Sequence, residues 1–229
     1  MSNSPLVTYT RITKNKTSPR NHEIDTITIH CIVGQWTAKQ GCDYFATTDR
    51  ECSANYVVGK DGSIGLSVDE KDRAWTSGGS YTVNGITGSM NDHRAVTIEV
   101  ASDTTHPYAI TDEAYKALVN LVADICKRNN IKELKWKADK SLVGKVDKQN
   151  MTVHRWFANK ACPGDYLYNL HDEIAKEVNA ILSKTVETTS KTLYRVQVGA
   201  FSKKSNADAM LKKVKAAGFT DAFITTVSK

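Results

Sequence analysis

The sequence predicts an α/β fold with a central β-sheet flanked by helices, followed by a small C-terminal βαβ module. Short β-rich runs recur through the first half of the chain, as the strands of one sheet would. Two longer stretches carry apolar residues at helical spacing, which is typical of helices packed on a sheet. The composition, 40% hydrophobic and 24% charged, is that of an ordinary soluble globular protein.

The first strand is predicted at residues 26–33, where the alternating run TITIH brings His30 to its end. A polar stretch that contains Pro5 and Pro19 precedes it. Thr37 is a good helix-capping residue, so a short helix is expected from there through Ala46.

A hairpin is predicted at residues 53–68. The β-rich runs SANYVVGK and SIGLSV are separated by Asp61-Gly62, the signature of a two-residue turn that needs positive φ. Residues 74–94 are crowded with Gly, Ser and Asn and predict a long loop. Because long loops inside compact domains are usually functional, we expect this one to form the rim of a cleft.

Residues 95–102, AVTIEVAS, predict a central strand with one apolar face made by Val96, Ile98 and Val100. Glu99 lies on the other face, either on a solvated surface or buried for a functional reason. The rarity of buried glutamate favours the solvated surface.

Two amphipathic helices are predicted, at residues 111–129 and from Asp165 onward. The first has a capping Thr111, two acidic residues in its first turn and two basic residues in its last. The second carries one apolar stripe made of Leu167, Leu170, Ile174, Val178 and Ile181. We assign these stripes to the core and give them no chemical role.

The strongest chemical signal is residues 152–165, TVHRWFANKACPGD, in which His154 and Cys162 lie close together with Lys160 between them. Imidazole and thiolate are both good zinc ligands, and a third is available in His30 at the end of its strand. The alternative interpretation is a core histidine and a small buried cysteine, which is the commoner use of these residues.

The net charge is unevenly distributed along the chain. Residues 1–182 have equal numbers of basic and acidic residues, so the whole net charge of +6 lies in residues 183–229. A basic tail indicates binding to nucleic acid, to an anionic membrane surface or to an anionic wall polymer. The alternative interpretation is a solvated helix face with no partner. Residues 183–192 are polar and rich in Ser and Thr, and we interpret them as a linker between domains at 1–182 and 193–229.

No apolar run is long enough for a membrane span, and the N-terminal residues lack the apolar core of a signal peptide. We therefore expect a protein made in the cytoplasm, with no transmembrane segment. The five cysteines are an odd number in a fairly long chain, which argues against a disulfide framework.

The ordered set of TIH, SANYVVGKDG, TIEV and the His-x7-Cys loop, with Lys160 before the cysteine and Pro163 after it, resembles the zinc-dependent N-acetylmuramoyl-L-alanine amidases. That family shares its fold with peptidoglycan recognition proteins and many phage endolysins, and the resemblance covers about residues 20–182. It implies a mixed β-sheet flanked by helices, with one Zn²⁺ per chain held by His30, His154 and Cys162.

The resemblance also implies roles. The chain would hydrolyse the amide between N-acetylmuramic acid and L-alanine of the peptidoglycan stem, with Glu99 moving the proton and Lys160 stabilising the oxyanion. Some relatives use a tyrosine where this chain has Ala54, which shifts the proton-transfer role to Glu99. Asn55 and Trp75 are candidate substrate contacts, although the sequence after Trp75 departs from the family pattern.

Two alternatives remain at this stage. One is a peptidoglycan-recognition module that binds without cutting, although such modules commonly lack the metal-binding thiol that this chain retains. The other is a zinc endopeptidase that cuts within the stem peptide. We expect bacterial peptidoglycan as the partner and no nucleic acid. Action on the cell wall would then follow holin-mediated release or lysis if the protein is an endolysin, whereas an autolysin would be cellular.

Residues 193–227 resemble the first half of a sporulation-related repeat (SPOR) domain, which binds septal glycan strands. The run YRVQVGAF predicts a strand, Ala207, Met210, Leu211 and Val214 line a helix, and residues 222–227 predict a second strand. So small a unit seldom folds alone, and its open sheet edges invite pairing. We expect it to form a homodimer contact, or alternatively to stay mobile until it meets glycan.

Overall fold

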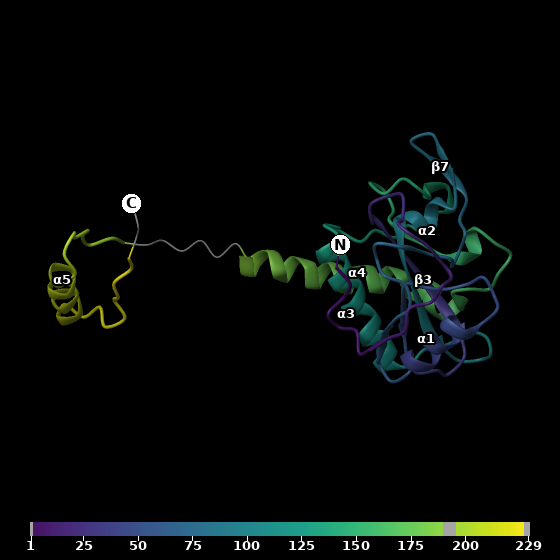
Figure 1. Ribbon diagram of the computed structural model, residues 1–229, viewed down its shortest axis with the longest axis horizontal. Helices are drawn as coiled ribbons and strands as arrows, with labels where there is room; N and C mark the ends of the chain where they lie inside the picture. The colour runs from purple at the N-terminus through teal and green to yellow at the C-terminus, as the bar shows by residue number, and fades with distance from the viewer. Residues whose placement is uncertain (1, 190–195, 227–229) are drawn as a thin grey trace. The chain divides into compact units, whose positions relative to one another are not determined.

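Two parallel strands, β3 (Thr26–Val33) and β9 (Ala95–Ser102), lie at the centre of the sheet (Figure 1). Their register places His30 directly opposite Glu99. The computed structural model describes residues 2–189 and 196–226, which belong to two compact units, Met1–Thr188 and Thr189–Lys229.

The sheet has six strands in the order β1-β5-β4-β9-β3-β10. β4 (Tyr56–Val58) and β5 (Ile64–Leu66) form the predicted antiparallel hairpin, whereas β1 (Tyr9–Thr10) and β10 (Met151–Thr152) pair in parallel with their neighbours. The predicted mixed sheet is therefore confirmed. A second, two-stranded sheet joins β2 (Lys16–Thr17) to β6 (Arg73–Ala74).

Helices cover both faces of the sheet, as the strand alternation predicts. α3 (Asp112–Arg128) and α4 (Gly164–Thr189) pack on the face that carries Ile27, Ile29 and Ile98. α1 (Ala38–Thr47) packs on the opposite face through Cys42 and Phe45. Thr37 caps α1 with a full capping box, and Thr111 caps α3.

The predicted long loop at residues 74–94 contains more structure than expected. β7 (Tyr81–Val83) and β8 (Ile86–Gly88) form a hairpin, and α2 (Met90–Arg94) follows it. The turn of this hairpin is Asn84-Gly85, and both residues have positive φ. Asn-Gly is the sequence signal for such a turn, so the loop prediction was wrong here because the signal was overlooked.

The segment interpreted as a linker begins as helix. α4 runs to Thr189, because neither Gly nor Pro occurs between Asp165 and that residue to end it. Two short 3₁₀ helices, η1 (Lys140–Leu142) and η2 (His154–Trp156), complete the larger unit. The domain boundary at residues 182–193 stays a prediction.

In the smaller unit, α5 (Lys204–Ala216) lies where a helix was predicted. The described parts of the two predicted strands, residues 196–201 and 222–226, do not form strands, and the rest of both runs lies outside the described residues. A strand needs a paired neighbour, and a unit of this size buries too little to hold two strands together. Its large apolar side chains are accordingly exposed: Val196, Val198, Phe201, Phe219, Phe223 and Ile224.

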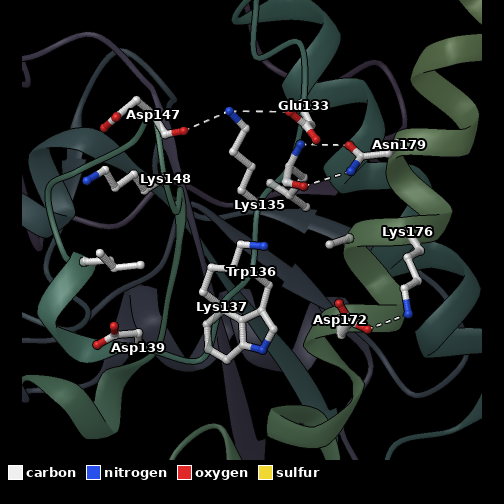
Figure 2. A pocket seen from close by; sticks show the side chains of 13 residues that line it. Glu133, Lys135, Trp136, Lys137, Asp139, Asp147, Lys148, Asp172, Lys176 and Asn179 are labelled. Carbon is white, nitrogen blue, oxygen red and sulfur yellow. Dashed lines mark hydrogen bonds and ion pairs between the residues drawn. The ribbon is translucent and has the colours of Figure 1, made fainter.

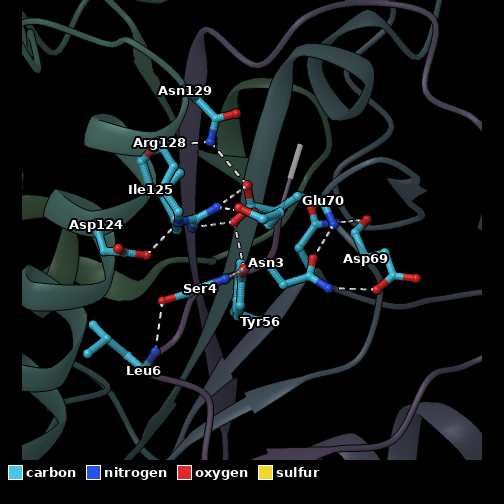
Figure 3. A network of polar contacts seen from close by, with 12 residues as sticks. Asn3, Ser4, Leu6, Tyr56, Asp69, Glu70, Asp124, Ile125, Arg128 and Asn129 are labelled. Carbon is cyan, nitrogen blue, oxygen red and sulfur yellow. Dashed lines mark hydrogen bonds and ion pairs between the residues drawn. The ribbon is translucent and has the colours of Figure 1, made fainter. Parts of the chain in front are cut away.

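A buried ion pair ties the N-terminal segment to the sheet and to α3 (Figure 3). Both carboxylate oxygens of the buried Glu70 accept hydrogen bonds from Arg128, and Tyr56 and Asn129 donate further bonds to them. The side chain of Asn3 accepts a bond from the Glu70 backbone N–H. Glu70 is thus fully paired away from water, and it depends on Arg128 for charge balance.

We predict that Arg128→Met lowers the free energy of unfolding by about 3 kcal/mol, because it leaves a buried carboxylate without its cation. Urea denaturation would measure this loss. The matched control is Lys176→Met, whose ion pair with Asp172 is largely exposed and contributes little to stability. Equal losses in the two variants would contradict the assignment.

Candidate active site

His30 reaches the site because β3 is a long central strand buried on both sides. Its side chain is fully buried and lies on the same face of the sheet as Glu99. Burial lowers the pKa of His30 well below its ordinary value, and His154 adds to this effect. The imidazole is therefore neutral, with a lone pair available for a metal.

His154 and Cys162 come from the segment that follows β10. His154 is the first residue of η2, and Cys162 lies two residues before α4. Arg155 holds this loop closed: its guanidinium donates to the Ala161 carbonyl at 2.7 Å and to Asp165 at 3.0 Å, and its backbone N–H donates to the Cys162 carbonyl. These bonds fix the position from which Cys162 faces β3.

The three predicted metal ligands come together. His30, His154 and Cys162 each offer one ligand atom, and these atoms lie within 4.8 Å of one another. The Cys162 Sγ is 3.3 Å from the His30 Nδ1, close to the spacing of about 3.5 Å that tetrahedral zinc imposes on a sulfur and a nitrogen ligand. The second ring nitrogen of His30, Nε2, is buried with no hydrogen-bond partner. A set of two imidazoles and one thiolate fits zinc and leaves one coordination position open.

Glu99 lies beside this cluster, with its Oε1 3.8 Å from the His30 Nδ1. Burial raises the pKa of Glu99 to about 8, and its Oε2 is buried without a partner. The solvated-surface interpretation favoured by the sequence was therefore wrong, because only 16% of the side chain is exposed. A carboxyl in this condition can hold or transfer a proton near neutral pH.

A hollow of about 320 Å³ opens beside Glu99 and His154. Four large aromatic side chains are among the residues that line it: Trp36, Tyr44, Phe45 and Trp75. A larger hollow of about 720 Å³ lies between residues 133–148 and α4 (Figure 2). Lysines and acidic residues line it, and none of the three proposed metal ligands does. The smaller hollow is therefore the one that adjoins the ligand cluster.

One wall of the smaller hollow is fixed by a buried carboxylate. Asp92 in α2 accepts hydrogen bonds from the backbone N–H groups of Thr76, Ser77 and Gly78. The indole N–H of Trp75, in the same segment, donates to Thr17. Sequence reasoning missed Asp92, since it lies inside the predicted loop with no pattern around it.

The other three predicted site residues, Trp75, Lys160 and Asn55, lie in different surroundings. Trp75 is half-buried and lines the smaller hollow, as a substrate contact would. Lys160 is exposed on the loop between two ligands; its backbone N–H donates to the Ala158 carbonyl, and its ammonium group makes no hydrogen bond or ion pair with the described residues. Asn55 is fully buried, and its side chain bonds to Val68 and Thr97, so its position gives no support to a substrate contact.

Cys31, also missed, belongs to the same site. It follows His30 in β3, lines the smaller hollow and is 8% exposed. The side chain of Cys162 lowers the pKa of Cys31. The dipeptide His30-Cys31 was the only signal for it in the sequence.

Two family models match the chain. The family model described as N-acetylmuramoyl-L-alanine amidase matches residues 20–165, and the SPOR domain model matches residues 169–229. Among curated protein sequences none matches the chain.

Solved structures share the fold. A selenomethionine derivative of AmpD is 19% identical with a TM-score of 0.55, covering 75% of this chain and 96% of its own. The Staphylococcus aureus hydrolase AmiA, in complex with its ligand, is 14% identical with a TM-score of 0.53, covering 84% and 90%. The PlyL structure is 14% identical with a TM-score of 0.51, covering 74% and 95%.

We predict that Glu99→Gln changes how stability depends on pH in the metal-free chain. Folded Glu99 keeps its proton to about pH 8, whereas in the unfolded chain it ionises near 4.5. The stability of the wild type therefore falls as pH rises between these values. Because the variant cannot ionise, its stability relative to wild type should rise by about 2 kcal/mol from pH 4 to pH 9, less than the full shift since 16% of the side chain is exposed.

Urea denaturation in the presence of a chelator, at several pH values, would measure this difference. A difference between variant and wild type that stays constant across the range would show that Glu99 is solvated.

Proposed function

We propose, because this chain belongs to the N-acetylmuramoyl-L-alanine amidase family, that it cleaves the amide between N-acetylmuramic acid and L-alanine with one zinc ion held by His30, His154 and Cys162. Family membership makes the chain a peptidoglycan amidase. The observation that carries the metal assignment is the convergence of these three side chains from β3 and the loop before α4.

A zinc ion bound there would supply Lewis acidity and lower the pKa of a coordinated water toward neutrality. The protein's own residues would do the rest. Glu99, with its raised pKa and unpaired Oε2, accepts a proton from the attacking water and returns it to the departing amine.

Lys160 provides positive charge for the oxyanion. Its ammonium group makes no hydrogen bond or ion pair with the described residues, so it is available to a substrate. Burial lowers the pKa of His154, Asp92 opposes this effect, and the charge of Lys160 adds to it, which supports a role for this cation beside the ligand. A fixed cation beside a carbonyl that becomes an oxyanion stabilises the transition state more than the ground state.

The aromatic hollow would hold the substrate next to these groups. Trp36 and Trp75 offer flat apolar surfaces on which a sugar ring or a peptide side chain can lie. Asn55 supports the site indirectly, since its side-chain bonds to Thr97 hold β4 against β9.

The C-terminal unit serves attachment rather than catalysis. The SPOR domain model matches residues 169–229, which include the whole of this unit, and no described residue of the unit belongs to the ligand cluster. Its exposed side chains include Val196, which is 86% exposed, and Phe223, which is 74% exposed. Apolar groups of this size are usually covered by a partner. We propose that this partner is a second copy of the chain. The paired units would then bind glycan.

The enzyme acts on the cell wall. None of the described helices is both long and apolar enough to cross a membrane. We propose that it reaches the wall after holin-mediated release or lysis.

We predict that Cys162→Ser reduces bound zinc from about one ion per chain to nearly none, because a hydroxyl is a far weaker zinc ligand than a thiolate. Metal analysis of the purified chain would measure this. Cys52→Ser is the matched control, since Cys52 lies near Glu99 but outside the ligand cluster, and it should keep its zinc.

Mass spectrometry of fragments released from purified walls would test the activity in the same samples. Wild type should release peptides that begin with L-alanine, and Cys162→Ser should release none. L-alanine left on muramic acid would identify an endopeptidase, and full lysis by a zinc-free chain would contradict the metal assignment.

We predict that the full chain sediments as a dimer at micromolar concentration and that a chain ending at Thr189 sediments as a monomer. Phe223→Asp should also give a monomer, because it places a charge in the apolar contact. Both variants should keep their zinc, which confirms that the catalytic unit is folded. A monomeric full chain would exclude dimerisation, and a dimer that survives truncation would place the contact on the amidase domain.

A further inference from the structure

Trp36 is held in a fixed position at the smaller hollow, which also reaches Glu99. Its backbone carbonyl accepts a hydrogen bond from the Lys60 N–H at 2.8 Å, and its half-buried side chain packs against the apolar cluster under α1. The ring also lies beside that of Tyr44, with the two ring centroids 5.3 Å apart. Because these contacts order the indole before a ligand binds, a ligand that packs on it loses little affinity to side-chain ordering.

Gly34 makes room for this indole. A Cβ atom at position 34 would lie 2.9 Å from the indole Nε1 of Trp36, which is closer than Cβ atoms approach other heavy atoms. The backbone of Gly34 cannot easily move away, since its N–H donates to the Ile32 carbonyl and its carbonyl accepts from the Ser102 N–H. The φ angle of Gly34 lies outside the left-handed region, so the indole, and not the backbone conformation, requires glycine here.

The polar ends of Trp36 and Tyr44 are available to a ligand. Neither the indole N–H nor the phenol O–H forms a hydrogen bond with the described residues, and both side chains line the smaller hollow. By contrast, the indole N–H of Trp75 already donates to Thr17 at 2.9 Å. One wall of the hollow therefore combines a flat apolar face with an unused donor and an unused hydroxyl, as small-ligand pockets do.

The smaller hollow also lacks a cation other than a protonated histidine. Its described lining includes no lysine, arginine or aspartate, and its one carboxyl, Glu99, can only repel a carboxylate. In the substrate of the proposed reaction, the stem peptide carries free carboxylates. The sugar ring carries no charge, because the carboxyl group of muramic acid is consumed in the scissile amide. A buried carboxylate without a partner is costly, so this lining suits the sugar better than the peptide.

The size of the hollow limits its occupant. Ligand pockets commonly measure about 300 to 1,000 Å³, so a hollow of about 320 Å³ holds one ring and not a chain of sugars. A pyranose ring presents apolar C–H groups on its face and hydroxyl and acetamido groups on its edge. These groups match the face of the Trp36 indole and the free polar groups beside it.

We propose that Trp36 is a specificity-determining residue, whose indole stacks on the N-acetylated sugar ring of muramic acid and so selects stem peptides that are still attached to glycan. The proposal rests on the proposed amidase function for the identity of this sugar. Gly34 is then a positioning residue, since it allows the indole to lie where the sugar meets it.

Two synthetic compounds with the same scissile amide test this proposal. One is N-acetylmuramyl-L-alanyl-D-glutamate, and the other is D-lactyl-L-alanyl-D-glutamate, which lacks the sugar ring. Isothermal titration calorimetry would measure the binding of each to the full chain after a chelator has removed its metal. Wild type should bind the muramyl compound about tenfold more tightly, since one well-stacked ring typically contributes about that factor.

Variants of the indole and its support give the decisive comparison. Trp36→Ala should weaken binding of the muramyl compound about tenfold and leave binding of the lactyl compound unchanged. Gly34→Ala should act in the same direction by displacing the ring, whereas Trp36→Phe should keep part of the preference. Gln35→Ala is the matched control, because this exposed neighbour does not line the hollow, and it should keep the full preference. If Trp36→Ala fails to fold, Gly34→Ala and Trp36→Phe still decide the question.

Equal binding of the two compounds by wild type, or an undiminished preference in Trp36→Ala, would overturn the proposal. Equal losses for both compounds in Trp36→Ala would show that the indole holds the peptide instead. The zinc-loaded chain separates this proposal from the proposed function. A chain that prefers the muramyl compound but cleaves neither would refute the amidase activity and leave the sugar site standing. Cleavage of both compounds with the same KM would support the amidase and exclude the sugar site.

Discussion

The in-register pairing of β3 with β9 is the constraint on which the site depends. It sets His30 opposite Glu99 on one face of the sheet, and both strands are buried along nearly their whole length. A slip of one residue would turn either side chain to the opposite face and into the apolar core. The hydrophobic alternation that forms the core therefore also positions the residues for which we propose a catalytic role.

Burial then determines the protonation of His30 and Glu99. Loss of water disfavours the charged form of each group, so His30 stays neutral while Glu99 holds a proton to about pH 8. A neutral imidazole is the form that binds a metal, and a carboxyl with a pKa near the working pH transfers protons efficiently. A single physical cause thus prepares a ligand and a proton carrier.

The sequence predicted the helices and strands better than the contacts between them. The strands that carry His30 and Glu99 and the apolar stripe of α4 were found because their periodicity is strong. Asp92 and Arg155 were missed as parts of the site, because their roles arise from hydrogen bonds within irregular loops, which no helical or strand periodicity predicts. Local pattern could not predict whether residues 196–201 and 222–226 form strands, since a strand exists only when another strand pairs with it.

The metal centre combines two kinds of support. His30 is fixed by a sheet, whereas His154 and Cys162 belong to a surface loop that would be mobile without further contacts. The Arg155 guanidinium supplies them, since it bridges the Ala161 carbonyl and Asp165 at the start of α4. α4 in turn packs on the core that holds β3, the strand of His30. The sheet and the loop therefore take their positions from one hydrophobic core.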